Sequence, residues 1–383
     1  MKAVLIHIPN LPWECIARDD AAQLVPTLFA MIEGGSAGPL PAVGPEPLMD
    51  GVLLTGRRPA DSGMLTRRAP RPDGFGTDLA TAMHLKSPAV TEYLDAAGLR
   101  CASVNLRATG FAALANGVVA SDAFFEIRAR TFDDWGIPPG ALAPLHMADD
   151  LSDLRVHPED LLPSQLGPLM SREPQLDSAA QLRTMAKALA ESSGAHSVAT
   201  HLVEHGAYDV CMVRYPMFAQ LGGQFAEPAT QPTGKGAAWL LIELLDKFIA
   251  RLKYLAGDDT VFMITGGLEE KPFWIAHGAG IPADQLWPQG ASMYDIAPSL
   301  LALFGLRDDA MPGSPRMGRS ELVQASAPAD ANKGPAFDLG GFPLAAAAGP
   351  STAQLQILEG QKAAERRALE QAAIAEAGTG PAV

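Results

Sequence analysis

Cysteine is scarce in this chain of 383 residues. Its three cysteines, Cys15, Cys101 and Cys211, stand far apart in the sequence. None of them forms a Cys-x-x-Cys pair, so the pattern indicates neither a disulfide framework nor a cysteine metal site. Long apolar runs are also missing, since none reaches the ~18 residues of a membrane-spanning helix and none has the shape of a signal peptide. We therefore expect a soluble, cytoplasmic protein without membrane insertion.

Basic residues are also fewer than acidic residues in this sequence. The chain has 29 Lys and Arg against 43 Asp and Glu, which gives a formal net charge of −14. Such a protein repels phosphate backbones and anionic membrane surfaces, so nucleic acid is not an expected partner. Hydrophobic residues make up 48% of the sequence, which is typical of a globular chain with a substantial core. The length fits one large α/β domain or two ordinary ones.

Runs typical of buried strands alternate with helical periodicity along most of the chain. The predicted strands are residues 3–8, 100–105, 208–215 and 259–265, and the predicted helices are 24–33, 87–97, 194–206 and 236–255. In the second helix, Ser87 is the expected N-cap and Pro88 the first helical residue. This alternation predicts an α/β fold, with a mostly parallel central sheet flanked by helices on both faces.

Two regions depart from this alternation. Residues 110–190 are rich in proline and have no clear period, so we interpret them as an inserted cap region. Beyond the α/β domain, residues 1–322, the composition shifts to Ala, Pro and Gly, which predicts a flexible linker over 323–350. Residues 351–383 form the expected C-terminal tail, with a helix over 351–377 that is rich in strong helix formers.

Several segments stand in an order and spacing that resemble a known family. They are LVPTLFAMIEGGSAGPL with VLLTGRRPADSGM, then AAGLRCASVN, LAGDDTVFMIT and SMYDIAPSLLALFGL. Together they resemble the type I phosphodiesterase/nucleotide pyrophosphatase branch of the alkaline phosphatase superfamily, over about residues 3–322. The resemblance implies an alkaline-phosphatase-like fold. It also implies a site at the carboxyl ends of the strands, where Asp and His hold two metals and Thr or Ser attacks phosphorus.

The chain departs from the family at the positions that carry this chemistry. The equivalents of the metal ligands and the nucleophile are Pro9, Glu46, Ala219, Gly223, Gly266 and Gly267. Glu46 stands at the nucleophile position, and none of the other five has a carboxylate or imidazole. We therefore expect no metal or other cofactor at these positions, and we interpret the site as degenerate.

Two functions are compatible with this pattern. The first hypothesis is a non-catalytic pseudoenzyme that acts as a binding or assembly partner of another protein, with the C-terminal helix as a candidate docking element. The alternative is a metal-dependent phosphodiesterase or nucleotide pyrophosphatase with a displaced site, hydrolysing phosphate mono- or diesters. The sequence does not indicate an oligomeric state.

The roles of a few polar residues near the implied site have two interpretations each. Glu46 and Asp50 are either carboxylates with a role in the pocket or solvated acids of one loop. Arg57 and Arg58 could bind an anion or carry surface charge. His277 is expected near the pocket rim.

Other polar residues have structural interpretations. His7 is expected to be a satisfied buried histidine, and Asp295 the cap of the following helix. His201, Glu204 and His205 match the His-x-x-Glu-His pattern of inverted zinc proteases and form an alternative metal site. Their predicted helix ends at the amino edge of the sheet, whereas sites in open α/β folds lie at the carboxyl edge.

Overall fold

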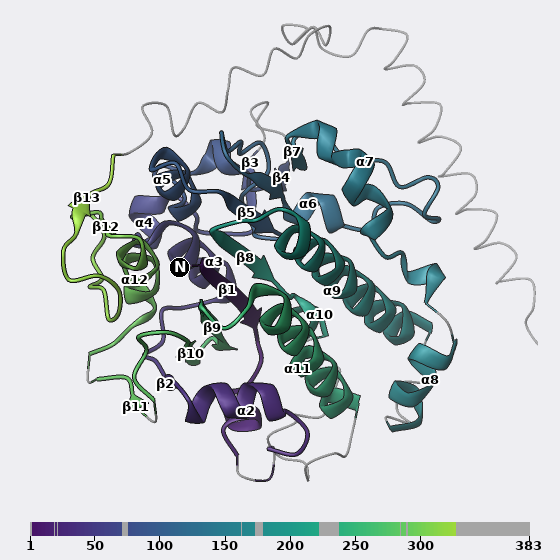
Figure 1. The fold of residues 1–383 in the computed structure, drawn as a ribbon. Coiled ribbons are helices and arrows are strands. Elements are labelled where there is room, and N and C mark those ends of the chain that lie inside the picture. The colour runs from purple at the N-terminus through teal and green to yellow at the C-terminus, as the bar shows by residue number, and fades with distance from the viewer. Residues whose placement is uncertain are drawn as a thin grey trace, which may run out of the picture. The chain divides into compact units, whose positions relative to one another are not determined.

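In a computed structural model, the protein is built on a sheet of nine strands (Figure 1). The structure describes residues 2–18, 20, 22–70, 76–161, 163–172, 179–221, 237–283, 285–288 and 290–326. Across the sheet the strands are β11 (Gln285–Leu286), β2 (Ser36–Pro39), β10 (Lys271–His277), β9 (Thr260–Leu268), β1 (Lys2–Pro9), β8 (Val210–Arg214), β5 (Cys101–Val104), β6 (Val118–Ala120) and β7 (Leu142–Ala143). All pairings are parallel except those of β10 and β7 with their neighbours.

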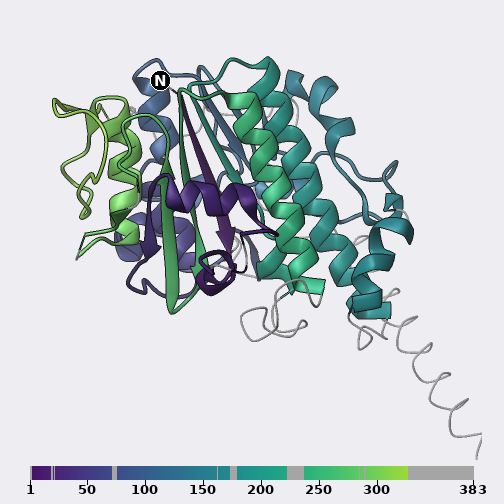
Figure 2. The same ribbon diagram turned by 60° about the horizontal axis from the view of Figure 1, so that its bottom comes forward.

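Helices cover both faces of this sheet, as Figure 2 shows. One face packs against α2 (Pro26–Glu33), α9 (Ala179–His205) and α11 (Ala237–Ala256), and the other against α3 (Glu46–Thr55), α5 (Val90–Ala96) and α12 (Ile296–Leu303). In β1, Val4, Ile6 and Ile8 enter the first core, while Ala3 and Leu5 enter the second. Burial on both faces explains why β1 is a continuous apolar run. The predicted α/β fold is confirmed.

The start of α5 differs from the prediction. Val90 is the first helical residue and Ala89 occupies the N-cap position. The Ser87 hydroxyl instead donates to the carbonyl of Asp61, at 3.1 Å. The Glu92 carboxylate accepts the N–H of Ala89 at 2.6 Å and satisfies one of the free donors at the helix start.

Part of the predicted cap region belongs to the sheet itself. Strands β6 and β7 both lie within residues 110–190, and α9 begins at Ala179 rather than at residue 194. The other helices in this region are α6 (Asp122–Phe125), α7 (Ala148–Leu151) and α8 (Pro163–Arg172). The two strands have three and two residues, which is too short for a period of two to be recognised in the sequence.

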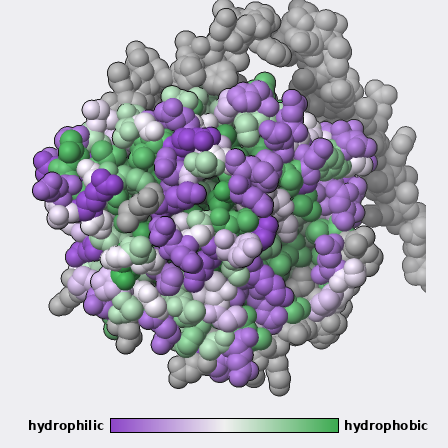
Figure 3. Space-filling model, viewed as in Figure 1, coloured by the Kyte–Doolittle hydropathy of each residue, from purple (hydrophilic) through white to green (hydrophobic). Residues whose placement is uncertain are grey.

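The remaining elements are short. They are α1 (Trp13–Ile16), α4 (Pro59–Ser62), α10 (Met217–Leu221) and two small sheets, formed by β3 (Arg68–Pro70) with β4 (Thr77–Leu79) and by β12 (Leu306–Arg307) with β13 (Val323–Gln324). All described residues lie in the first of two units, Met1–Pro335, and the second unit is Ala336–Val383. The predicted tail, and the linker beyond residue 326, lie outside the described residues. Within the described residues, no helix is long and apolar enough to cross a membrane. On the face of the molecule that Figure 3 shows, hydrophilic and hydrophobic residues are intermingled.

Candidate functional site at the carboxyl edge of the sheet

The end of β9 contains two of the family-equivalent ligand positions, Gly266 and Gly267. Gly266 and Gly267 lie inside the strand, where they pair with Ile8 and Pro9 of β1 on one side and with Phe273 and Pro272 of β10 on the other. The chain then turns through residues 269 and 270 directly into β10. The two positions at which the resemblance implies metal ligands are therefore paired within the sheet, directly before a tight hairpin.

Neither glycine leaves room for a side chain. A Cβ at Gly266 would lie 2.3 Å from the carbonyl oxygen of Ile8, and one at Gly267 would lie 2.3 Å from that of Lys271. Gly267 also has φ +105°, a backbone conformation that residues with a Cβ rarely adopt. The strand pairing itself thus excludes Asp and His at these two positions.

The other family-equivalent positions carry no ligand either, as far as the structure describes them. Pro9 ends β1, and Ala219 lies within α10 with only a methyl group as its side chain. Glu46 is the first residue of α3, with its side chain outside the described set, and Gly223 lies wholly outside it.

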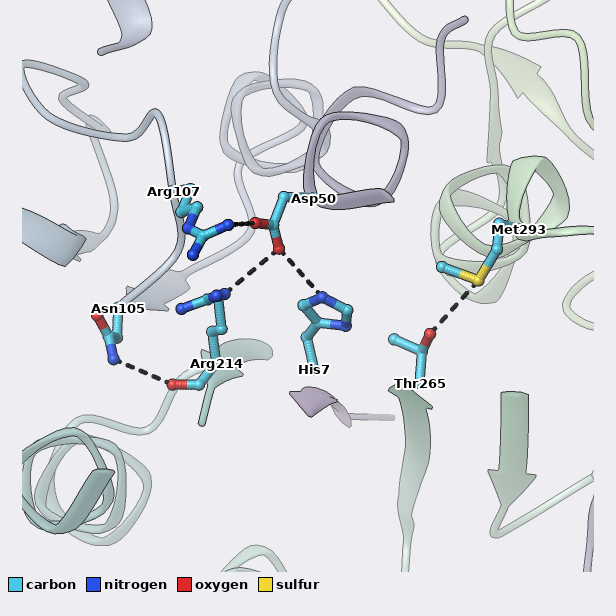
Figure 4. Close-up of polar contacts among 7 residues, drawn as sticks. All are labelled: His7, Asp50, Asn105, Arg107, Arg214, Thr265 and Met293. Atoms are coloured by element: carbon cyan, nitrogen blue, oxygen red, sulfur yellow. Dashed lines mark hydrogen bonds and ion pairs between the residues drawn. The ribbon is translucent and has the colours of Figure 1, made fainter. Parts of the chain in front are cut away.

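Asp50 is the centre of a buried cluster of charged side chains, which Figure 4 shows. Its Oδ2 accepts a hydrogen bond from Arg107 Nη1 at 2.8 Å, and its Oδ1 accepts one from Arg214 Nε at 3.3 Å. The Nε2 atom of His7 lies 3.0 Å from the same Oδ1. Asp50 is only 6% exposed, and it lies on α3 rather than in a loop. The reading of Asp50 as a solvated loop acid is therefore wrong. We call His7, Asp50, Arg107 and Arg214 the carboxyl-edge cluster.

The sheet topology explains why these residues meet. His7 lies near the carboxyl end of β1, Arg214 is the last residue of β8, and Arg107 follows β5 by three residues. The three strands are parallel neighbours, with His7 in register with Arg214. Parallel strands end at the same edge, so their polar terminal residues converge there. The side-chain amide of Asn105 strengthens this corner by donating to the Arg214 carbonyl at 3.2 Å.

Electrostatics keep Asp50 ionised. Burial acts to raise its pKa, but the charges of Arg214 and Arg107 and the contact with His7 outweigh burial and hold the pKa well below its usual value. A carboxylate between two guanidinium groups at these distances is a strong, charge-assisted arrangement. The cluster therefore joins α3 to three strands of the sheet.

Two further acids lie buried near this edge. Burial raises the pKa of Asp122, the first residue of α6, to about 6, although Arg67, Arg214 and Arg107 act against the shift. Burial also raises the pKa of Glu191 on α9, whose carboxylate accepts a hydrogen bond from the amide of Gln220. The hydroxyls of Ser121 and Ser192, each next to one of these acids in sequence, are fully buried without a hydrogen-bond partner.

The residues at this edge do not fit the two divalent metals that the family resemblance implies. Across the part of the chain that the structure describes, no group of three or more His, Cys, Asp or Glu side chains has a metal-binding arrangement. The Asp50 carboxylate is held by two guanidinium groups, whose positive charge would repel a metal ion brought to the same oxygens. Guanidinium groups thus supply positive charge in the region where the family is expected to place metals.

His277 does not lie at this edge. It is the last residue of β10, which runs antiparallel to β9, and it is in register with Phe262 near the start of β9. His277 is therefore at the amino edge of the sheet, and its expected place at the pocket rim is wrong. The expectation failed because the reversed direction of β10 is not visible in the sequence.

The alternative metal residues lie near the end of α9. The rings of His201 and His205 stack with centroids 4.6 Å apart, and His205 Nδ1 donates to the His201 carbonyl at 3.0 Å. Glu204 forms a 3.6 Å ion pair with Arg251 instead of joining them.

The remaining residues that the sequence analysis named are Arg57, Arg58 and Asp295. Arg57 contacts the carboxylate of Asp308, and Arg58 is the exposed N-cap residue of α4. Asp295 does not cap α12 with its side chain. Its carboxylate accepts hydrogen bonds from Ser292 N at 3.0 Å, Ser314 N at 2.8 Å and Arg316 Nε at 2.8 Å, which joins the start of α12 to a later loop.

No protein-family model matches this sequence, and no curated protein matches it either. Solved structures do match its fold. Ps i-CgsB in complex with k-i-k-neocarrahexaose is 11% identical, with a TM-score of 0.51 over 82% of this chain and 74% of that one. A putative sulfatase from Bacteroides thetaiotaomicron is 10% identical, with a TM-score of 0.50 over 82% of this chain and 73% of that one.

A phosphonoacetate hydrolase from Sinorhizobium meliloti, in complex with phosphonoformate, is 16% identical. Its TM-score is 0.42, and the match covers 70% of this chain but only 55% of the hydrolase. The chain thus spans about half the length of that relative. At these identities the likeness extends to the fold alone, and on that level the expected resemblance is confirmed: the chain has the fold of the alkaline phosphatase superfamily.

Proposed function

We propose that this protein is a non-catalytic member of its fold group, which acts as a binding or assembly partner of another protein. The observation that carries the proposal is the strand pairing of Gly266 and Gly267, which excludes ligand side chains where a catalytic relative is expected to have them. A change of two residue types could in principle be reversed by mutation. Here, however, a Cβ at either position would lie 2.3 Å from a backbone carbonyl oxygen, so substitution alone does not restore a ligand.

The carboxyl-edge cluster supports the same conclusion. A metal-dependent hydrolase uses its metals to lower the pKa of a nucleophile and to stabilise charge on the transition state. Here Arg107 and Arg214 carry positive charge, but both bind Asp50, and their side chains are 7% and 2% exposed. They are placed to hold the fold together rather than to meet a substrate.

One observation favours the alternative of a hydrolase with a displaced site. Asp122 and Glu191 are buried carboxyl groups with raised pKa values near the same edge. Raised carboxyl pKa values are a property of general acids, although buried structural acids share it. The displaced-site hydrolase requires a substrate that reaches the carboxyl groups of both Asp122 and Glu191.

A hydrolysis assay separates the two proposals. The full chain should be incubated with p-nitrophenyl phosphate, its diesters and p-nitrophenyl sulfate, with and without added zinc or manganese. We expect no hydrolysis above buffer under any condition. Metal-dependent turnover that a chelator abolishes would contradict the non-catalytic proposal. If turnover were instead lost in both Asp122→Asn and Glu191→Gln, the displaced site would be supported.

The partner role is tested separately, through the predicted helix over residues 351–377. A chain lacking residues 345–383 should keep its melting temperature and lose the partner that co-purifies with the tagged full chain from its native host. A marked drop in melting temperature would place the segment on the protein's own core. Unchanged partner recovery would remove the tail from the account of function.

A further inference from the structure

A recess of about 250 Å³ opens at the amino edge of the sheet, at the opposite end of the strands from the carboxyl-edge cluster. Its lining includes Gly34, Lys253, Asp258, Thr260 and His277. Gly34 ends α2, and Lys253 lies in the last turn of α11, so two helix C-termini meet at the recess. The N-terminus of α2 is fixed to α11, because Asp246 accepts the N–H groups of Thr27 at 3.2 Å and Leu28 at 2.8 Å.

The recess depends on glycine at position 34. A Cβ there would lie 3.0 Å from the Ala30 carbonyl oxygen and 3.3 Å from Nε2 of His277. The imidazole thus occupies the space beside the helix end that a larger residue would need. The Thr260 hydroxyl is already used, since it donates to the Ala256 carbonyl at 2.8 Å.

The polar groups of the recess are of both signs. The last carbonyl groups of α2 and α11 carry partial negative charge, and Asp258 adds a carboxylate at the rim. Burial and the neighbouring Lys253 lower the pKa of His277, so its imidazole is neutral at pH 7 and offers a nitrogen acceptor. Lys253 supplies one positive charge. Within the described residues, the Lys253, Asp258 and His277 side chains have no hydrogen-bond or ion-pair partner of their own.

We propose that this recess binds a small zwitterion of the α-amino acid type. An ammonium group needs acceptors around it, and the Asp258 carboxylate and the His277 imidazole provide two, beside the negative ends of α2 and α11. The carboxylate of the same molecule would pair with the Lys253 ammonium. A simple anion would face two negative helix ends, and a simple cation would face Lys253, so a ligand with both charges matches the recess best.

A second recess beside the first can accept the side chain of the ligand. A second, more open recess of about 560 Å³ adjoins the first, sharing Lys253, Gly257 and Asp258 with it. Its remaining lining includes Pro26, Ala250 and the 78% exposed Tyr254. These surfaces are largely apolar, which predicts a preference for amino acids with apolar or aromatic side chains over glycine.

Calorimetric titration of the full chain with L-leucine, L-phenylalanine and glycine tests the proposal. We expect saturable binding of the first two, weaker binding of glycine, and loss of binding for N-acetyl-L-leucine and L-leucinamide, each of which lacks one of the two charges. Equal binding of the acetylated or amidated compounds would overturn the zwitterion assignment. No binding of any amino acid would overturn the site.

Substitutions at the two charges locate the binding. Lys253→Met and Asp258→Asn should each weaken binding at least ~5-fold, which corresponds to about 1 kcal/mol. Lys86→Met and Asp150→Asn, at exposed positions elsewhere, are the matched controls and should bind as the unaltered chain does. Binding that survives both Lys253→Met and Asp258→Asn would contradict this site. Thermal unfolding of each variant excludes misfolding as the cause of any loss.

Discussion

Oδ1 of Asp50 lies 3.0 Å from Nε2 of His7, which joins a helix on one face of the sheet to the carboxyl end of its central strand β1. The same carboxylate also pairs with Arg107 and Arg214, so one buried acid connects α3 with the ends of β1, β5 and β8. The carboxyl-edge cluster therefore holds a helix and three strand ends together through charged side chains.

Asp50→Asn should destabilise the protein strongly. The substitution removes the negative charge and leaves the buried guanidinium groups of Arg107 and Arg214 uncompensated, at a cost of about 3 kcal/mol or more. Equilibrium urea unfolding measures the change. Asp150→Asn, on an exposed position of α7, is the control and should stay within about 0.5 kcal/mol of the unaltered chain. A loss below ~1 kcal/mol for Asp50→Asn would mean that the cluster contributes little to folding.

The titration of Asp122 should be visible in the pH dependence of the free energy of unfolding. Its pKa of about 6 in the folded state lies above the usual value of an unfolded aspartate. Its contribution to stability is therefore fully present below pH ~4 and is lost as the pH rises through about 6. The side chain of the Asp122→Asn variant cannot ionise, so this variant does not lose stability through this group as the pH rises.

Relative to the unaltered chain, Asp122→Asn should gain on the order of 2 kcal/mol in the free energy of unfolding between pH 4.5 and pH 7.5. Urea unfolding at the two pH values provides the measurement. Stability profiles that run parallel between these pH values would show that Asp122 does not titrate in this range. The contribution of Asp50 to stability has the opposite pH dependence. Because the pKa of Asp50 is lowered in the folded state, this contribution is present above pH ~4 and is lost as the pH falls further.

Restoring single ligands should not create activity. Pro9→Asp adds one carboxylate, whereas a metal needs three or four ligands at once. Gly267→His should in addition destabilise the fold by about 2 kcal/mol or more, because φ +105° and the nearby Lys271 carbonyl leave no space for its Cβ. Hydrolysis of p-nitrophenyl phosphate and urea unfolding are the two measurements. Detectable turnover in either variant would show that the rest of a metal site is intact.

The fold could be predicted because its signals are local. Residues 3–8 form a continuous apolar run, and the helix predicted over 236–255 matches α11 closely. The two short strands β6 and β7 were missed since neither is long enough to show a period. The N-cap of α5 lies at Ala89, two residues beyond the predicted Ser87, and the Glu92 carboxylate accepts its N–H.

The site is harder to predict, because the resemblance points to positions such as Pro9 and Gly267, which are not members of the carboxyl-edge cluster. The sequence predicts a buried, satisfied His7 and two readings of Asp50, and it does not single out Arg107 or Arg214. In the structure His7 is buried and its Nε2 contacts Asp50, but its Nδ1 has no hydrogen-bond partner among the described residues. A signal was present in the sequence: charged residues stand at or just after the ends of three apolar strands. Parallel strands bring such residues to one edge, although their pairing depends on the strand order, which the sequence does not reveal.

The metal content of the purified full chain is the measurement that bears most closely on the proposed absence of a catalytic metal site. The protein should be purified without chelator, dialysed against buffer containing zinc and manganese, desalted and measured by elemental analysis. We predict far less than one metal ion per chain, because glycines paired in the sheet and a carboxylate held by arginines stand where ligands would be needed. One or two tightly bound metal ions per chain would contradict the account.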